Sequence, residues 1–301
     1  MAVVIDRKHP LFFAEVTGID LAAPLDDGAV STLEDALADH GVLHFPGQTL
    51  TTAQQIAFSR RFGNLETDYN RKDLDGVAAV APEIVRVSNL DTQGNLLPPD
   101  ATYSKHSSAS CIFHSDSSFK YVPSKCSLLY AIQVSSNGAN TEFADMRAAY
   151  DDLTVAEKER IDGLIVEHSI IYSRSQVGFT DFPEAYRQKV PPVPQLLVRT
   201  HSRSQRKSLY LGSHASHIVG RPIDEGRALL KELTDHATQP KYVHAHKWAP
   251  GDLVMWDNRS MLHRRAPGKI AGPPQPRELY RTTVQDIGNT VEIAKNLAHA
   301  H

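Results

Sequence analysis

The sequence of 301 residues predicts a mainly β protein with flanking helices, arranged as an antiparallel sandwich or jelly roll. Short segments rich in β-branched and aromatic residues lie between turn residues in much of the chain, while several predicted helices gather at the N-terminus. The sequence has no alternating βαβ pattern and neither of the glycine-rich motifs GxGxxG and GxxxxGK. These absences argue against a nucleotide-binding parallel sheet.

Helical spacing of apolar residues predicts four helices. The first begins near Asp26 and Asp27, which are candidate N-caps. The second is amphipathic, opens at Thr51 and ends at Gly63. The predicted ranges are 26–40, 51–63, 154–165 and 224–237.

Strands are predicted where short β-rich runs are bounded by Pro, Gly, Ser or Asn. The first follows the N-terminal helix and ends at Pro46-Gly47. The predicted strands are 41–47, 125–134, 170–173, 196–200, 208–212 and 252–257.

Residues 67–109 are polar and show little periodicity. A segment of this length without structure of its own is typical of a functional loop. We therefore expect a single domain of residues 1–301, with 67–109 as a loop or lid insertion over a site.

Composition excludes several classes of protein. A net charge of -3 gives no electrostatic reason to bind nucleic acid or an acidic membrane surface. No apolar run is long enough for a signal peptide or a membrane span. The two cysteines, Cys111 and Cys126, are expected to be reduced thiols. The sequence thus predicts a cytoplasmic protein.

The chain contains one His-x-Asp pattern, His114-Ser115-Asp116. Residues i and i+2 of a strand share a face, so this pattern predicts an imidazole beside a carboxylate. The best candidate for a third ligand is His263, which follows the predicted strand 252–257 and a turn. Two histidines and one carboxylate form the facial triad of non-haem Fe(II) oxygenases, which leaves adjacent positions for a cosubstrate and O2.

Two arginines follow this candidate ligand set. Arg277 and Arg281 lie four residues apart in the β-rich segment RELYRTTV, so they are predicted to share a face. A guanidinium in a half-buried site is suited to binding a carboxylate through two hydrogen bonds. The alternative for either arginine alone is a surface ion pair.

The order of these motifs resembles the TauD/TfdA family of Fe(II)- and 2-oxoglutarate-dependent dioxygenases, nearest its 2,4-dichlorophenoxyacetate dioxygenase branch. The resemblance runs from about His9 to RELYRTTV and includes GVLHFPGQTLTTAQQIAFSRRFG, GANTEFADMRAAYDDL and GSHASHIVG. It implies a double-stranded β-helix (jelly roll). It also implies hydroxylation of a small anionic, aryloxyacetate-like carboxylate with ether cleavage, giving succinate and CO2.

The resemblance implies a role for each matching residue. His114, Asp116 and His263 match the family's iron ligands. Arg277 matches the arginine that binds the distal carboxylate of 2-oxoglutarate, and Thr141 matches the threonine that assists it.

On the substrate side, Arg281 matches a position that holds the substrate's acidic group in relatives with acidic substrates. Two residues depart from the family pattern there. Phe113 stands where Trp is frequent, and Ser110 stands where a polar amide is frequent. Both departures leave the iron ligands intact and leave the identity of the substrate open.

Several alternatives stay open at this point. The same chemistry could act on taurine or another aminosulfonate, or on an aliphatic amino acid. A zinc hydrolase or isomerase could use the same triad, and a jelly-roll binding protein would have no activity at all. His214 and His217 could line the pocket or pack beside it, and their spacing of three gives no reason to assign them as ligands. A homo-oligomer, dimer or tetramer, is expected by analogy alone.

Overall fold

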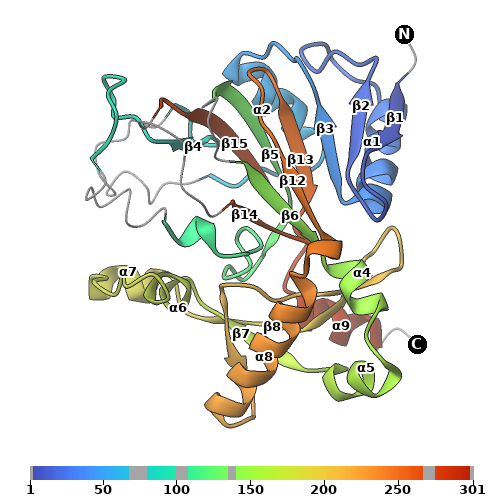
Figure 1. The fold of residues 1–301 in the computed structure, drawn as a ribbon, viewed down its shortest axis with the longest axis vertical. Coiled ribbons are helices and arrows are strands. Elements are labelled where there is room, and N and C mark those ends of the chain that lie inside the picture. Colours follow the sequence, from blue (N-terminus) through green and yellow to red (C-terminus); the bar gives the residue numbers. More distant parts are fainter. Residues whose placement is uncertain (1–2, 68–79, 99–107, 135–139, 267–274, 299–301) are drawn as a thin grey trace.

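The computed structural model describes residues 3–67, 80–98, 108–134, 140–266 and 275–298. Two sheets dominate the upper part of the molecule in Figure 1. The larger has the order β1-β2-β3-β13-β5-β15-β4, and only the β2–β3 pair is parallel. Its strands are Val4–Arg7, Ala14–Thr17, Val42–Phe45, Leu253–Asp257, Ser124–Gln133, Glu278–Gln285 and Val85–Ser88, in that order.

The smaller sheet is antiparallel and has the order β12-β6-β14. Its strands are Val243–His246, Thr141–Asp145 and Met261–Arg265. One hydrophobic cluster joins side chains of both sheets, among them Leu129 and Trp256 from the larger sheet and Phe143 and Met261 from the smaller one. The two sheets therefore pack face to face, as the predicted jelly roll requires.

The other face of the larger sheet is covered by α1 (Asp27–His40) and α2 (Thr52–Arg60). The Asp26 side chain caps α1 by accepting a hydrogen bond from Ala29 N–H. A reciprocal capping box between Thr51 and Gln54 starts α2. Both helices were predicted from the sequence, with ends within three residues of those observed.

The lower part of the molecule holds two further small sheets and most of the remaining helices (Figure 1). The sheets have the orders β11-β7-β8 and β10-β9. Their strands are β7 (Ile165–His168), β8 (Val193–Leu196), β9 (Val198–Thr200), β10 (Lys207–Leu209) and β11 (Ala215–Ile218). The helical elements, including the 3-10 turns η2 and η3, are η2 (Ser108–Cys111), α4 (Met146–Asp151), α5 (Val155–Ile161), α6 (Ile170–Ser175), α7 (Glu184–Lys189), α8 (Ile223–Ala237), η3 (Pro240–Tyr242) and α9 (Thr290–Ala298).

The predicted helices at 154–165 and 224–237 correspond to α5 and α8. The predicted strand at 170–173 is wrong, because these residues form α6. Ser169 is the N-cap of this helix, and its hydroxyl accepts a hydrogen bond from Tyr172 N–H at 3.2 Å. The β-rich residues Ile-Ile-Tyr that follow it led to the prediction of a strand. The predicted strand at 196–200 is divided between β8 and β9.

The segment 67–109 is only partly within the described residues. Its described part includes β4, which extends the larger sheet by pairing with β15. Residues 68–79 and 99–107 lie outside the described residues, so closure of a lid stays a prediction.

Within the described ranges, none of the helices combines the length and hydropathy that a bilayer span requires. Cys111 and Cys126 are free thiols, as expected. The cytoplasmic location stays a prediction.

Candidate metal centre

The two segments that carry the predicted ligands meet through an isolated antiparallel bridge. His114 N–H donates to the His263 carbonyl at 3.0 Å, and His263 N–H donates to the His114 carbonyl at 2.9 Å. The prediction that His114 and Asp116 share a strand is wrong. Asp116 begins a turn, in which Ser117 has a φ of 53°. The turn, rather than strand alternation, brings the carboxylate to the imidazoles.

The three predicted ligands form one compact group. His114, Asp116 and His263 each offer a donor atom, and all three donor atoms lie within 4.8 Å of one another. His263 Nε2 is 3.8 Å from Asp116 Oδ2, and the two imidazole centroids are 4.2 Å apart. Asp116 and His263 are almost fully buried.

The two imidazoles are neutral and oriented for metal binding. His114 Nδ1 donates to the Ile112 carbonyl at 2.8 Å, which places the ring proton on Nδ1 and leaves the Nε2 lone pair free. Burial lowers the pKa of both His114 and His263. His263 Nδ1 is buried without a hydrogen-bond partner.

Asp116 is ionised because of its neighbours. Burial alone would raise the pKa of this carboxyl, but the positive charge of Arg281 and the hydrogen bond from Ser127 outweigh burial and hold the pKa well below its usual value. Arg281 Nη1 donates to Asp116 Oδ1 at 2.5 Å. The Arg281 Nε is buried and has no hydrogen-bond partner.

A second layer of hydrogen bonds fixes the carboxylate, and the sequence analysis missed it. Ser127 Oγ donates to Asp116 Oδ2 at 2.7 Å, and Asn258 Nδ2 donates to Ser127 Oγ at 2.9 Å. Asn258 Oδ1 accepts from Asp116 N–H at 3.1 Å and from Trp256 Nε1 at 2.9 Å. In the sequence Ser127 is one residue of an apolar strand and Asn258 a turn residue, so neither carries a signal of this role.

The residues expected to hold 2-oxoglutarate come from separate elements. Thr141 is the buried first residue of β6, and its hydroxyl oxygen accepts from Trp248 Nε1 at 3.0 Å. Arg277 directly precedes β15, and its backbone N–H donates to Asn89 Oδ1 at 2.8 Å. A register shift beside Glu278 leaves its extra residue, Ile132, in β5, and β15 pairs with β4 without a shift. Because Arg277 precedes the strand, the common face of the two arginines stays a prediction.

The remaining predicted residues lie around the centre in different ways. Ser110 lies in η2, four residues before His114. The His214 ring is perpendicular to that of His114, with centroids 6.0 Å apart, and burial lowers its pKa. His214 thus packs beside the centre, outside the ligand group. His217 lies in β11, and its Nδ1 is 3.5 Å from Glu167 Oε1.

The residues present fit a divalent metal ion. Two neutral imidazoles and one ionised carboxylate are the donor types that non-haem iron takes, and each must be unprotonated to bind. The hydrogen bond from His114 to a carbonyl and the bonds to Asp116 are the outer contacts usual around metal ligands.

The family model described as "Taurine catabolism dioxygenase TauD, TfdA family" matches residues 6–283. An alpha-ketoglutarate-dependent 2,4-dichlorophenoxyacetate dioxygenase of Burkholderia sp. (strain RASC) is 43% identical over 94% of this chain and 94% of its own length. A (S)-phenoxypropionate/alpha-ketoglutarate-dioxygenase of Sphingobium herbicidovorans is 39% identical, over 87% of this chain and 93% of its own.

A solved structure confirms the fold at the same level of similarity. The crystal structure of AAD-2 in complex with Mn(II) and N-oxalylglycine aligns with a TM-score of 0.87 and 43% identity, and the alignment covers 96% of this chain and 99% of that one. The predicted jelly roll and the predicted dependence on a metal, 2-oxoglutarate and O2 are confirmed at the level of the family. With its motifs in family order and a matching model over nearly its whole length, this chain belongs to the TauD/TfdA family of 2-oxoglutarate-dependent dioxygenases.

Proposed function

We propose that this enzyme uses Fe(II), 2-oxoglutarate and O2 to hydroxylate an aryloxyalkanoic acid at the carbon next to its ether oxygen. The observation that carries the substrate class is Arg281, whose guanidinium adjoins Asp116 and whose Nε is buried without a partner. A buried donor with positive charge favours a ligand that brings a carboxylate to that position. The relatives described above are named for phenoxyacetate and phenoxypropionate, both of which are ether-linked carboxylates.

In this proposal His114, Asp116 and His263 hold the iron. Iron in such a triad, when bound, couples the activation of O2 to the oxidative decarboxylation of 2-oxoglutarate into succinate and CO2. The protein keeps both imidazoles neutral and the carboxylate ionised, which are the states that binding requires.

Thr141 and Arg277 are assigned to the distal carboxylate of 2-oxoglutarate. Trp248 Nε1 can only donate, so its bond to Thr141 Oγ1 leaves the threonine proton free to donate elsewhere. Arg281 is assigned to the substrate carboxylate, and Ser110 to the substrate side of the pocket. An aryloxyacetate would give a hemiacetal, which collapses to a phenol and an aldehyde acid, and a phenoxypropionate would give a phenol and a keto acid in the same way.

The test is an anaerobic loading of the metal-free enzyme with Fe(II) and 2-oxoglutarate, followed by O2 and one candidate substrate at a time. The panel contains 2,4-dichlorophenoxyacetate, both enantiomers of a phenoxypropionate, taurine and an aliphatic amino acid. We expect one succinate for each phenol released. Coupled turnover of taurine with none of any aryloxyalkanoate would overturn the substrate assignment.

Asp116→Ala is the variant that tests the iron site, and succinate formation should fall to background. Asp35→Ala is the matched control, because Asp35 is an aspartate with a side chain 67% exposed that pairs only with Arg203 at the surface. The same assay separates the two other classes considered from the sequence. A zinc hydrolase or a binding protein would show no metal-dependent succinate with any substrate.

A further inference from the structure

A second group of two histidines and one aspartate lies in the same fold, outside the centre described above. His44 is in β3, His246 ends β12, and Asp252 directly precedes β13. Their donor atoms lie within 4.8 Å of one another. The proposed reaction gives no role to any of these residues.

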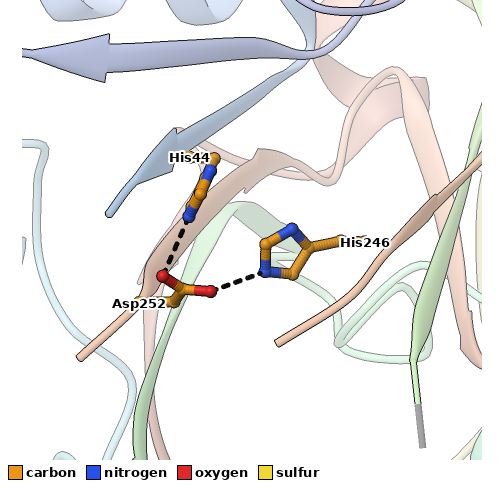
Figure 2. A group of neighbouring side chains, drawn as sticks. All are labelled: His44, His246 and Asp252. Atoms are coloured by element: carbon orange, nitrogen blue, oxygen red, sulfur yellow. Dashed lines mark ion pairs between the residues drawn. The ribbon is translucent and has the colours of Figure 1, made fainter. Parts of the chain in front are cut away.

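Both imidazoles point at the same carboxylate, one at each oxygen (Figure 2). His44 Nε2 is 3.0 Å from Asp252 Oδ1, and His246 Nε2 is 3.2 Å from Asp252 Oδ2. Two donors on a tetrahedral zinc ion, with bonds of about 2.0–2.1 Å, stand about 3.3 Å apart. Each of the two nitrogen–oxygen distances is close to this spacing, on different oxygens of the same carboxylate.

Each of the two ring nitrogens is paired with Asp252. Burial would raise the pKa of that carboxyl, but its contacts with His246 and His44 hold the pKa well below its usual value. Both nitrogens are buried, and neither contact has the angle of a well-formed hydrogen bond. A buried nitrogen in such a contact is poorly satisfied. A metal ion between the rings and the carboxylate would satisfy both nitrogens at once.

The surroundings of the group resemble those of a metal-bound histidine and carboxylate. The other ring nitrogen of His44, Nδ1, is 3.6 Å from Glu15 Oε2, and Glu15 is the cross-strand neighbour of His44 on β2. A carboxylate behind the second ring nitrogen is the usual outer partner of a metal-bound imidazole. Asp252 Oδ2 is held by Ala249 N–H at 2.8 Å.

We propose that His44, His246 and Asp252 form a second metal site, which binds one zinc-type divalent cation with an exchangeable water as a further ligand. Two of the ligands belong to the larger sheet or its edge and one belongs to the smaller sheet, so the ion joins the two sheets at one end of the sandwich. The site is independent of the oxygenase function proposed above.

The test is an anaerobic titration of the metal-free protein with Co(II), followed by visible absorption. Tetrahedral Co(II) absorbs far more intensely than the six-coordinate ion, so the two sites give distinguishable signals. We expect two equivalents to bind to the unaltered protein. The His114→Ala/Asp116→Ala double variant should bind only one equivalent of Co(II), the one with intense visible absorption, and added Zn(II) should displace this Co(II).

Removing the second site should have the opposite result. His44→Ala and, separately, His246→Gln should each lose the Co(II) equivalent with intense absorption and keep the one with weak absorption. Oxygenase turnover should still be present in both variants. His244→Ala is the matched control, because His244 lies two residues before His246 in the same strand and outside the ligand group.

Two outcomes would overturn this inference. One is binding of a single equivalent of Co(II) to the unaltered protein, with no binding to the double variant. The other is an intense equivalent that survives His44→Ala and His246→Gln. The melting temperature supplies a second readout for variants of low stability. Zn(II) should raise the melting temperature of the His114→Ala/Asp116→Ala protein. When His44→Ala is added to these two changes, Zn(II) should leave the melting temperature unchanged. Failure of the substrate assay would leave these results unaffected.

Discussion

At the scale of single residues, the proposed metal ligands depend on neighbours outside the ligand group. Asp116 receives hydrogen bonds from Ser127 and Arg281 on its two oxygens, and its backbone N–H is held by Asn258. Each bond limits the rotation of the carboxylate and keeps it ionised. Such outer contacts usually change metal affinity without abolishing the site.

Ser127→Ala is expected to weaken metal binding by roughly 10–100-fold, the usual effect of losing an outer partner. The change removes a hydrogen bond from Asp116 Oδ2 and leaves Asn258 Nδ2 without its acceptor. Binding of Mn(II), followed by electron paramagnetic resonance, measures the effect. Ser59→Ala is the matched control, since Ser59 is equally buried and bonds Thr282 Oγ1 at 2.6 Å. Equal affinities for the two variants would remove Ser127 from this role.

The kinetic constants of two variants distinguish the roles proposed for Arg281 and Arg277. Arg281→Ala should raise the KM for the aryloxyalkanoate at least tenfold more than the KM for 2-oxoglutarate, because a carboxylate–guanidinium bond of about 1.5–3 kcal/mol is lost at the substrate. Arg277→Ala should show the reverse pattern. Both assays use saturating Fe(II), since Arg281 also contacts Asp116. Interchanged patterns would exchange the two assignments.

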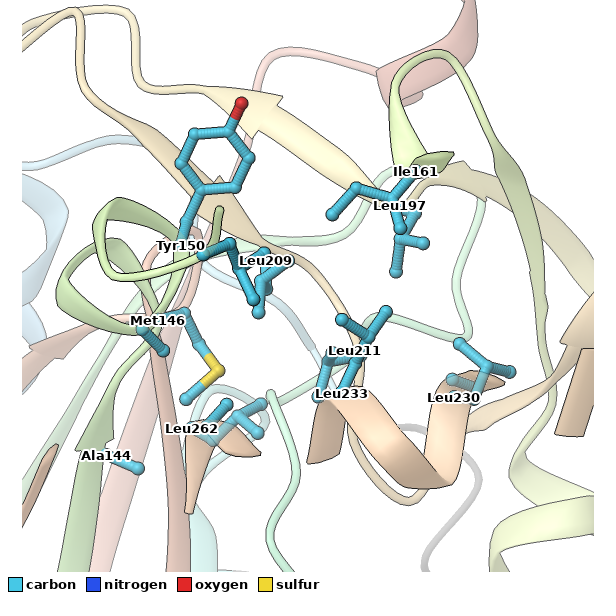
Figure 3. Packing of buried hydrophobic residues seen from close by; sticks show 14 of the residues in the cluster. Ala144, Met146, Tyr150, Ile161, Leu197, Leu209, Leu211, Leu230, Leu233 and Leu262 are labelled. Atoms are coloured by element: carbon cyan, nitrogen blue, oxygen red, sulfur yellow. The ribbon is translucent and has the colours of Figure 1, made fainter. Parts of the chain in front are cut away.

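At the scale of elements, the centre depends on a close approach between two loops. Gly212 has a φ of +108°, and a Cβ added there would lie 3.0 Å from the Phe113 carbonyl and 3.2 Å from His114 Cα. Its neighbours Leu211 and Leu262 belong to the buried cluster seen in Figure 3, so the segment has little room to move.

Gly212→Ala should therefore destabilise the metal-free protein by about 1–3 kcal/mol and displace His114, which also weakens Mn(II) binding. Gly220→Ala is the matched control. It has a similar positive φ of +81° but nothing within 4 Å of the added Cβ. Urea unfolding should show strain in both variants, whereas only Gly212→Ala should lose metal affinity. A loss of affinity in both would attribute the effect to general strain.

Elements were predictable where local signals and tertiary structure agree. The cap of α1 and the capping box of α2 stand in the sequence beside the apolar spacing, and both helices are found as predicted. At 170–173 the β-rich letters predicted a strand, but Ser169 caps a helix that the fold requires after β7. The His-x-Asp pattern identified two residues that do lie in one group with His263, but a turn rather than the predicted strand presents Asp116.

The second layer around the centre was not predictable from the sequence. Ser127 and Asn258 lie 131 positions apart and meet only because β5 and β13 pair. The same holds for His44, His246 and Asp252, which come from two sheets and share no spacing. Long-range pairing, rather than any local pattern, creates these contacts.

At the scale of the whole molecule, buried neutral histidines make stability depend on pH. Burial lowers the pKa of His168 to about 3, whereas an unfolded histidine titrates near 6.5. His168 is the last residue of β7, and its buried ring stacks on Tyr210 while Nδ1 is bonded to Ser118 Oγ at 3.0 Å. Between these two pKa values the unfolded chain binds a proton that the folded protein excludes. The contribution is therefore fully present above pH 6.5 and is lost as the pH falls toward 3.

The free energy of unfolding of the metal-free protein should consequently fall on acidification from pH 6.5 to 5. Each such histidine adds up to about 1.4 kcal/mol per pH unit to this slope. His168→Gln should reduce the slope by the amount that corresponds to about one bound proton, whatever its effect on stability at neutral pH. Urea unfolding at a series of pH values measures this slope. His217→Gln, on the neighbouring strand β11 and 25% exposed at its side chain, is the matched control for the histidine-to-glutamine change. A slope that His168→Gln does not alter would mean that the folded protein admits a proton at His168 as readily as the unfolded chain does.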